Sequence, residues 1–190
     1  MKQEQIIEAA RKLFHKFGFK KVSMDEIANE AGVTKKTIYM YFNSKEELLK
    51  YFIQEELLNM KSIVEEVENK NLNFFDTVNE GIYKLLNYKK EKDFLQIIAK
   101  EAEWLKNPIV IQNLQLIDKQ IQNYIKEKLQ EAKEKGFIRY DDLDVTAFLI
   151  YKMYIALMFE WDENNKKLDE KKIAKTITEI LKSGLGKEVE

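Results

Sequence analysis

Apolar residues recur along the chain at the spacing of amphipathic helices rather than at the alternation of strands. Between residues 2 and 17 they fall at positions i, i+4, i+7, i+8 and i+11, which lie on one face of a helix. The residues of this stripe are Ile6, Ala10, Leu13, Phe14 and Phe17. Similar patterns predict further helices over residues 45–69, 74–88, 93–105, 108–135, 143–161 and 170–185. Abundant helix-forming residues and a single proline agree with an all-α chain.

Two short helices near the N-terminus carry the most informative pattern. Ser23 can cap the first, Gly32 ends it, and Thr34 can cap the second. Ile38 and Phe42 share one face of the second helix and would hold it to the core. A helix, a glycine turn and a second helix are the order of a DNA-binding helix-turn-helix, whose second helix lies in the major groove.

The second of these helices offers side chains suited to DNA. Its first turn presents two lysines and a threonine, and its later turns present two tyrosines whose hydroxyls can reach phosphate oxygens. Lys45 begins the next helix, where a lysine opposes the helix dipole unless an anion lies nearby, and a DNA phosphate would be that anion. Any one exposed lysine is as often solvated as functional, so the prediction rests on the whole stretch. The predicted DNA-contacting residues are Thr34, Lys35, Lys36, Thr37, Tyr39, Tyr41 and Lys45.

Residues 6–52 carry a series of motifs in a fixed order. They are Ile7-x-x-Ala10-x-x-Leu13-Phe14, Phe17-Gly18-Phe19, Ser23-Met24-Asp25-Glu26-Ile27-Ala28, Ala31-Gly32-Val33-Thr34-Lys35, Ile38-Tyr39-Met40-Tyr41-Phe42 and Ser44-Lys45-Glu46-Glu47-Leu48. In this combination they resemble the tetracycline-repressor (TetR) family of bacterial transcription regulators. The resemblance implies double-stranded operator DNA and a small-molecule effector as partners, and a contact of Ser23 with DNA phosphate. Lys36 departs from the family pattern, in which a small residue is common at this position.

We expect an all-α fold with a three-helix helix-turn-helix DNA-binding domain at residues 1–46. A long helix joins it to a helical ligand-binding and dimerisation domain at residues 47–190. Segment 143–161 is apolar almost all round and must be covered on every side. With segment 170–185 it would form a four-helix homodimer interface about a two-fold axis. The dimer would place two recognition helices about 34–36 Å apart, as a palindromic operator requires.

Aromatic and methionine side chains are concentrated in the C-terminal helices. Such residues fill the core of any helical bundle. Together with the resemblance, however, they predict a pocket for an apolar or flat aromatic ligand, oriented by a few polar groups. The candidate ligand-binding residues are Gln96, Trp104, Tyr124, Phe148 and Tyr151.

Charge is distributed in the sense that an N-terminal DNA-binding domain requires. The net charge is −1, but residues 1–50 carry ten basic and seven acidic side chains, a balance of +3, and the rest of the chain carries −4. The sequence has no cysteine, which excludes thiolate metal sites, and its single histidine, His15, cannot assemble a cluster of histidine metal ligands. No P-loop, dinucleotide-binding glycine turn or HExxH motif is present. We therefore predict no enzymatic activity, no cofactor and no metal.

The expected protein is cytoplasmic and does not enter a membrane. Its N-terminus lacks the apolar core of a signal peptide, and its longest apolar run, residues 145–159, contains Lys152 and is too short to span a bilayer. We expect a ligand-responsive transcription regulator, a repressor that leaves its operator when the ligand binds. The alternative is a helical ligand carrier or interaction module with a degenerate DNA-binding domain, against which the intact recognition stretch argues.

Overall fold

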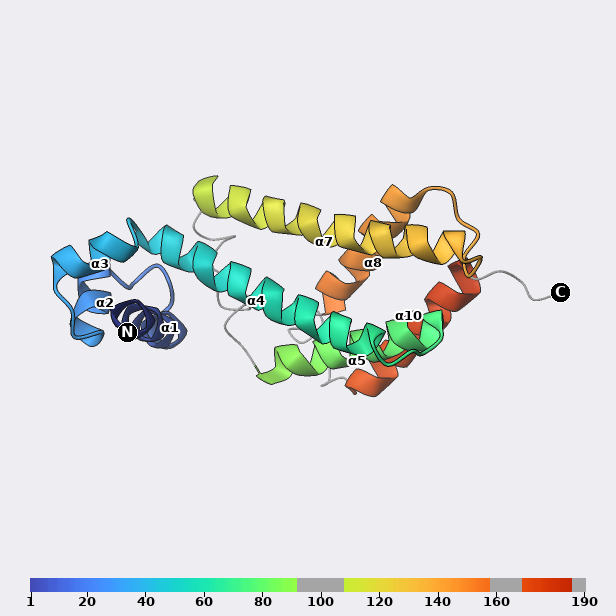
Figure 1. Cartoon of the computed structure of the whole chain (residues 1–190), viewed down its shortest axis with the longest axis horizontal. Helices are drawn as coiled ribbons and strands as arrows, with labels where there is room; N and C mark the ends of the chain where they lie inside the picture. Colours follow the sequence, from blue (N-terminus) through green and yellow to red (C-terminus); the bar gives the residue numbers. More distant parts are fainter. Residues whose placement is uncertain (92–107, 158–168, 186–190) are drawn as a thin grey trace. The chain divides into compact units, whose positions relative to one another are not determined.

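A computed structural model describes residues 1–91, 108–157 and 169–185, and these residues form an all-α protein (Figure 1). The helices in chain order are α1 (Lys2–Phe17), α2 (Met24–Glu30), α3 (Lys35–Tyr41), α4 (Lys45–Glu68), α5 (Phe74–Glu91), α7 (Pro108–Glu134), α8 (Leu143–Ile155) and α10 (Glu170–Leu185). This confirms the predicted fold class. The bounds lie close to the predicted ranges, and residues 158–161 of the predicted range 143–161 lie outside the described residues. The predicted helix over residues 93–105 lies outside the described residues.

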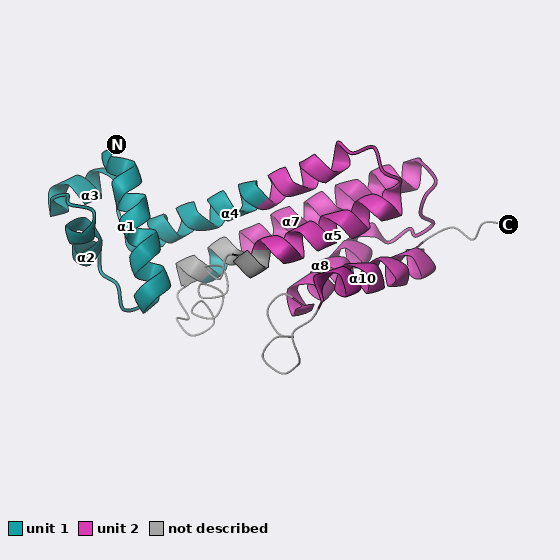
Figure 2. Ribbon diagram, turned by 90° about the horizontal axis from the view of Figure 1, so that it is seen from below, with its two compact units in different colours: residues 1–59, 92–114 teal, residues 60–91, 115–190 magenta. Residues whose placement is uncertain are grey.

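The chain divides into two compact units (Figure 2). Unit 1 comprises residues 1–59 and 92–114, and unit 2 comprises residues 60–91 and 115–190. Helix α4 begins in unit 1 and ends in unit 2. The domain boundary between residues 46 and 47 stays a prediction.

The core of unit 1 is aromatic. Phe14 of α1 and Phe52 of α4 are fully buried and meet edge to face, with ring centroids 6.1 Å apart. Phe19, in the loop between α1 and α2, lies edge to face with Phe14 at 5.2 Å. Ile38 is the residue of α3 that joins this core. Gly32 makes the turn between α2 and α3 at a φ of 65°, a conformation that glycine adopts without strain.

The core of unit 2 is mainly aliphatic. Helices α5 and α10 pack side by side, and α7 and α8 contribute to the same cluster. Its buried members are Leu86, Leu129, Ala132, Ile138, Leu143, Ala147, Ile173, Ile177, Leu181 and Leu185. Asp142 caps α8 by accepting the Val145 N–H at 3.0 Å, which fixes where the inner face of α8 begins.

Candidate nucleic-acid interface

The two helices of the helix-turn-helix begin at capped residues, as the sequence indicates. Ser23 Oγ accepts the Glu26 N–H at 3.2 Å, and Glu26 Oε2 accepts the Ser23 N–H at 2.8 Å, which completes a capping box. Hydrogen bonds from the side chain and backbone of Ser23 lower the pKa of the Glu26 carboxyl. Thr34 Oγ1 accepts the Thr37 N–H at 3.1 Å. The Ser23 and Thr34 hydroxyls therefore hold the starts of α2 and α3 in place.

Helix α3 exposes most of its surface. Ile38 is its one buried residue, so a single side chain and the following Phe42 fasten the helix to unit 1. The residues around Ile38 are exposed or half-buried: Lys35, Lys36, Thr37, Tyr39, Met40 and Tyr41. The structure thus brings the five candidates of α3 together on one short, exposed helix. It also adds Met40, which is 74% exposed and is not among the candidates predicted from the sequence.

Lys35 forms an ion pair with a carboxylate of the preceding helix. Its Nζ lies 2.9 Å from Asp25 Oδ2 on the first turn of α2. The hydrogen bond to Asp25 raises the pKa of the Lys35 ammonium, so this group stays charged. Both side chains are exposed, and exposed ion pairs contribute little to stability. The main effect of this ion pair is therefore on the position of the positive charge of α3, and not on stability.

Lys45, predicted to contact a phosphate, makes its hydrogen bonds within unit 1. Its Nζ donates to the carbonyl oxygens of Phe19 at 2.9 Å, Lys20 at 3.2 Å and Val22 at 3.0 Å. It also lies 4.6 Å from the centroid of the Phe19 ring. Carbonyl oxygens thus supply the negative charge that a lysine at a helix start requires. The phosphate contact of Lys45 stays a prediction.

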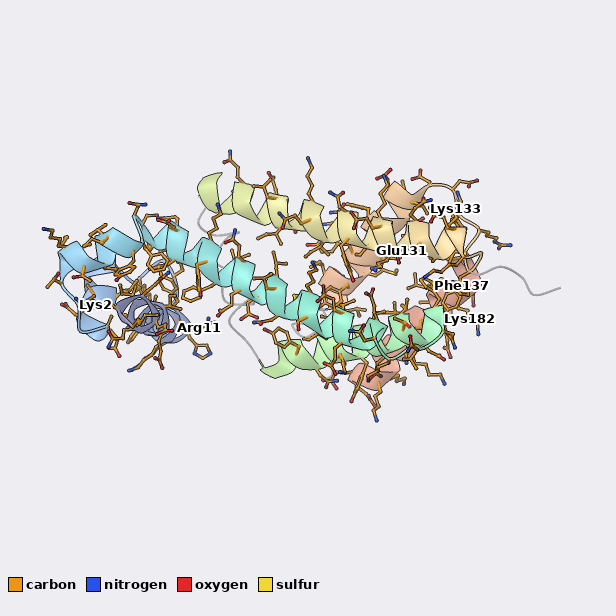
Figure 3. The ribbon with its side chains drawn as sticks, in the orientation of Figure 1. Lys2, Arg11, Glu131, Lys133, Phe137 and Lys182 are labelled. Carbon is orange, nitrogen blue, oxygen red and sulfur yellow. The ribbon has the colours of Figure 1, made fainter. Side chains whose placement is uncertain are left out.

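Helix α1 is joined to α4 by Arg11, which Figure 3 labels. Its guanidinium lies 4.7 Å from the centroid of the Phe52 ring and donates a hydrogen bond to Glu55. Its second nitrogen lies 3.7 Å from Oε1 of Glu56, a carboxylate that is only 1% exposed. No sequence pattern predicts this cluster, because Arg11 is distant along the chain from its partners, with a separation of 44 residues from Glu55.

The candidate ligand-binding residues are spread over unit 2 and the undescribed part of the chain. Gln96 and Trp104 lie outside the described residues. Tyr151 is buried on the inner face of α8 and donates its hydroxyl proton to Asp118 of α7, while Tyr124 of α7 donates to Glu68 at 3.2 Å. Burial raises the pKa of both phenols, so both remain proton donors. Phe148, in contrast to the buried Tyr151, is 45% exposed.

Phe148 belongs to an exposed apolar row on α8. Val145 and Leu149 are each 53% exposed, and with Phe148 and the exposed Lys152 they occupy positions i, i+3, i+4 and i+7. We call these four residues the α8 outer stripe. Helix α10 also exposes an apolar residue, Ile180, at 56%. The opposite side of α8 packs into the unit 2 core, so the stripe is the second apolar face that the sequence indicated.

One polar group of the inner face of α8 was missed by the sequence analysis. The Tyr154 ring packs against the unit 2 core, and its hydroxyl oxygen has less than 1 Å² of exposed surface and no hydrogen-bond partner among the described residues. Burial raises the pKa of this phenol. Tyr154 thus resembles Tyr151 in position but lacks a partner equivalent to Asp118.

Comparison with known proteins identifies the kind of regulator. The family model for bacterial regulatory proteins of the tetR family matches residues 6–52. The HTH-type transcriptional regulator YhgD of Bacillus subtilis, itself uncharacterised, is 33% identical over 97% of this chain and 96% of its own length. The chain belongs to the TetR family. The predicted family, the helix-turn-helix and the function as a DNA-binding transcription regulator are thereby confirmed.

Two further comparisons are with regulators from Bacillus subtilis. The fatty acid metabolism regulator protein of Bacillus subtilis is 26% identical over 97% of this chain and 95% of its own length. The crystal structure of FadR from Bacillus subtilis in complex with stearoyl-CoA is 25% identical and superposes with a TM-score of 0.77, covering 96% of this chain and 98% of FadR. Operator DNA and a small-molecule effector are therefore the classes of partner for a regulator of this family.

No described helix is long and apolar enough to cross a membrane. No three described His, Cys, Asp or Glu side chains are grouped so that they could hold a metal ion.

Asp25→Asn is expected to raise the affinity for DNA by about threefold, because it releases the Lys35 ammonium for a phosphate. Stability should change little, since the pair is exposed. The measurement is DNA binding by fluorescence anisotropy. Glu8→Gln, an equal charge change at an exposed position of α1, is the control. Equal gains in both variants would show that net charge, and not the Lys35 pair, controls the affinity.

Tyr154→Phe is expected to raise the free energy of unfolding of the ligand-free protein by about 1 kcal/mol, because it removes a buried donor that has no acceptor. Tyr151→Phe should instead lower the free energy of unfolding, since it removes a hydrogen bond to Asp118. Urea titration of both variants measures the difference. A lower free energy of unfolding in Tyr154→Phe would show that the Tyr154 hydroxyl does have a hydrogen-bond partner.

Proposed function

We propose that this TetR-family protein is a repressor that binds a palindromic operator as a homodimer and leaves it when an apolar ligand binds unit 2. The observation that carries the DNA-binding part is the exposure of α3. Six of its seven residues are exposed or half-buried, and they include two lysines and two tyrosines. A short helix held by one buried side chain can enter the major groove without burying its contact residues in the protein.

The residues of α3 divide by the chemistry that each can offer to DNA. Lys35 and Lys36 suit phosphate oxygens or guanine edges, and the hydroxyls of Tyr39 and Tyr41 suit phosphates. Thr34, Thr37 and Ser23 offer short hydroxyls at the helix starts, although the Ser23 hydroxyl also donates to Glu26 at 2.7 Å. Met40 would suit the methyl group of a thymine. The DNA-binding domain in this proposal comprises residues 1–46.

The homodimer is proposed to form through the α8 outer stripe and the exposed side of α10. Three large apolar side chains in one row of a helix are unfavourable in water and typical of an interface. Ile180 of α10 extends the apolar surface. A two-fold axis at this face would produce the four-helix interface expected from the sequence.

A long-chain acyl-CoA is the proposed effector. The similarity to FadR of Bacillus subtilis, whose structure contains stearoyl-CoA, supports this class over a flat aromatic drug. The proposed pocket residues are Gln96, Trp104, Tyr124 and Tyr151, whereas Phe148 suits the dimer interface better. We also propose that the protein has no catalytic activity and acts in the cytoplasm, where operator DNA is found.

The test is binding of the purified protein to its own upstream DNA by fluorescence anisotropy across a salt series, with scrambled DNA as competitor. Selective binding should weaken steeply with salt, with a slope of about −0.9 for each phosphate contacted. Stearoyl-CoA should release the DNA, and free CoA is the control. Weak binding that does not depend on the DNA sequence would favour the ligand-carrier alternative. Selective binding that stearoyl-CoA does not weaken would reject this effector.

A further inference from the structure

Tyr154 of α8 carries a buried donor that no contact within the described part of unit 2 explains. Its hydroxyl oxygen has less than 1 Å² of exposed surface, and no described residue forms a hydrogen bond with it. Tyr151, one turn earlier on the same helix, shows the usual arrangement, in which a buried phenol donates to an acceptor, here Asp118. A buried donor without an acceptor destabilises the ligand-free protein, and a ligand that brings an acceptor would remove this cost.

The core against which Tyr154 packs is apolar. The half-buried side chains that α5, α7 and α8 contribute to it include Val78, Ile82, Ile125, Ile150, Met153 and Leu157. Burial alone raises the pKa of the Tyr154 phenol, and no charged group among the described residues contributes to the shift. The hydroxyl therefore stays protonated at neutral pH and is a neutral donor in an apolar setting.

Unit 2 also contains space that its own side chains do not fill. Gly81 of α5 is buried, yet a β-carbon at this position would lie more than 4 Å from the nearest side chain, and from any backbone outside its own turns of helix. The neighbouring Ile82 packs against the same core as Tyr154. Protein interiors are normally close-packed, so open space beside a buried helix position supports a ligand site in this unit.

We propose that Tyr154 determines the ligand specificity of unit 2, and that its hydroxyl donates a hydrogen bond to the thioester carbonyl oxygen of a bound long-chain acyl-CoA. The inference rests on the proposed function, in which an acyl-CoA is the effector, and it names the ligand atom that the protein recognises. A neutral carbonyl suits a neutral donor in an apolar core, whereas a carboxylate or a phosphate would require a cation there. A saturated acyl chain has no acceptor of its own, so the thioester carbonyl is the group that fits.

Recognition of this kind discriminates between ligands that differ in one oxygen. S-octadecyl-CoA is a thioether with the chain length and the CoA part of stearoyl-CoA, but it lacks the carbonyl oxygen. It would leave the Tyr154 hydroxyl without an acceptor in the complex. Tyr154→Phe removes the hydroxyl and keeps the ring, so this variant should lose the discrimination and keep the apolar contacts. Changing the ligand and the residue together isolates the one hydrogen bond.

The experiment measures the dissociation constants of both ligands by isothermal titration calorimetry, below their critical micelle concentrations, for the full-length wild type and two variants. The wild type should bind stearoyl-CoA about tenfold more tightly than S-octadecyl-CoA, and Tyr154→Phe should bind the two about equally. Tyr140→Phe removes a phenol hydroxyl at an exposed position between α7 and α8, and it should keep the tenfold preference. Because Tyr154→Phe is expected to be more stable than the wild type, unfolding would not explain a lost preference.

Two results would overturn this inference alone. Equal binding of both ligands by the wild type would show that no donor recognises the carbonyl. A tenfold preference that persists in Tyr154→Phe would assign the contact to another donor. Failure of the proposed effector looks different, because the wild type would then bind neither ligand, and the inference would be rejected together with it.

Discussion

Leu149→Glu is expected to dissociate the dimer and to weaken operator binding by at least about 100-fold. Leu149 lies at the centre of the proposed interface, 53% exposed in the single chain, between Phe148 and Lys152 of the α8 outer stripe. Across a two-fold axis one substitution places a carboxylate on both sides of the interface. Burying two unpaired charges costs several kcal/mol, which exceeds a factor of about 100 in the dimer equilibrium.

Dissociation of the dimer should weaken DNA binding, because each protomer contributes one α3 to the complex. Two linked half-sites bind far more tightly than one, since the second contact is made at a high effective concentration. Monomers would therefore keep the contacts of a single half-site and lose this gain. The fold of the separate chain should survive, because the Leu149 side chain is not part of the buried core of unit 2.

The measurement is molar mass by light scattering together with operator affinity. Leu72→Glu is the matched control, since Leu72 is also exposed, at 42%, but lies in the loop before α5. A Leu149→Glu protein that remains dimeric would place the interface on another face of the chain. A monomer with wild-type operator affinity would separate dimerisation from DNA binding.

The sequence predicted the local features of the fold well, because these depend on neighbours in the chain. The caps at Ser23 and Thr34 and the turn at Gly32 follow from residue types a few positions apart. The bounds of the helices follow from apolar periodicity in the same way. Family membership required the order of many such signals, which a chance sequence does not reproduce.

The contacts that the sequence could not predict are those between distant segments and those made by the backbone. The partners of Lys45 are carbonyl oxygens, which every residue carries and no pattern distinguishes. The hydrogen bond from Tyr151 to Asp118 joins residues 33 positions apart. Periodicity places Phe148 in a helix that is apolar almost all round but cannot tell which of its two apolar faces points inward, and the structure shows Phe148 45% exposed.

Phe52→Ala is expected to destabilise unit 1 by about 3–5 kcal/mol and to abolish operator binding at ambient temperature. Phe52 is fully buried and contacts Phe14 and Tyr51 edge to face at 6.1 and 5.8 Å. Its ring also supports the Arg11 guanidinium, so truncation leaves a cavity and removes a cation–π contact. A loss of this size approaches the whole stability of a small domain.

The loss should be confined to the unit that contains Phe52. The unit 2 core is formed by a separate cluster on α5, α7, α8 and α10, so the dimer should persist while the N-terminal helices unfold. Thermal melting should then show an early transition absent from the wild type, and light scattering should still report a dimer. Phe17→Ala is the control, because Phe17 is 50% exposed on α1 and its removal leaves no cavity. Retention of operator binding by Phe52→Ala would mean that α3 is held by contacts other than the aromatic core, whereas loss of the dimer would mean that the two units unfold as one.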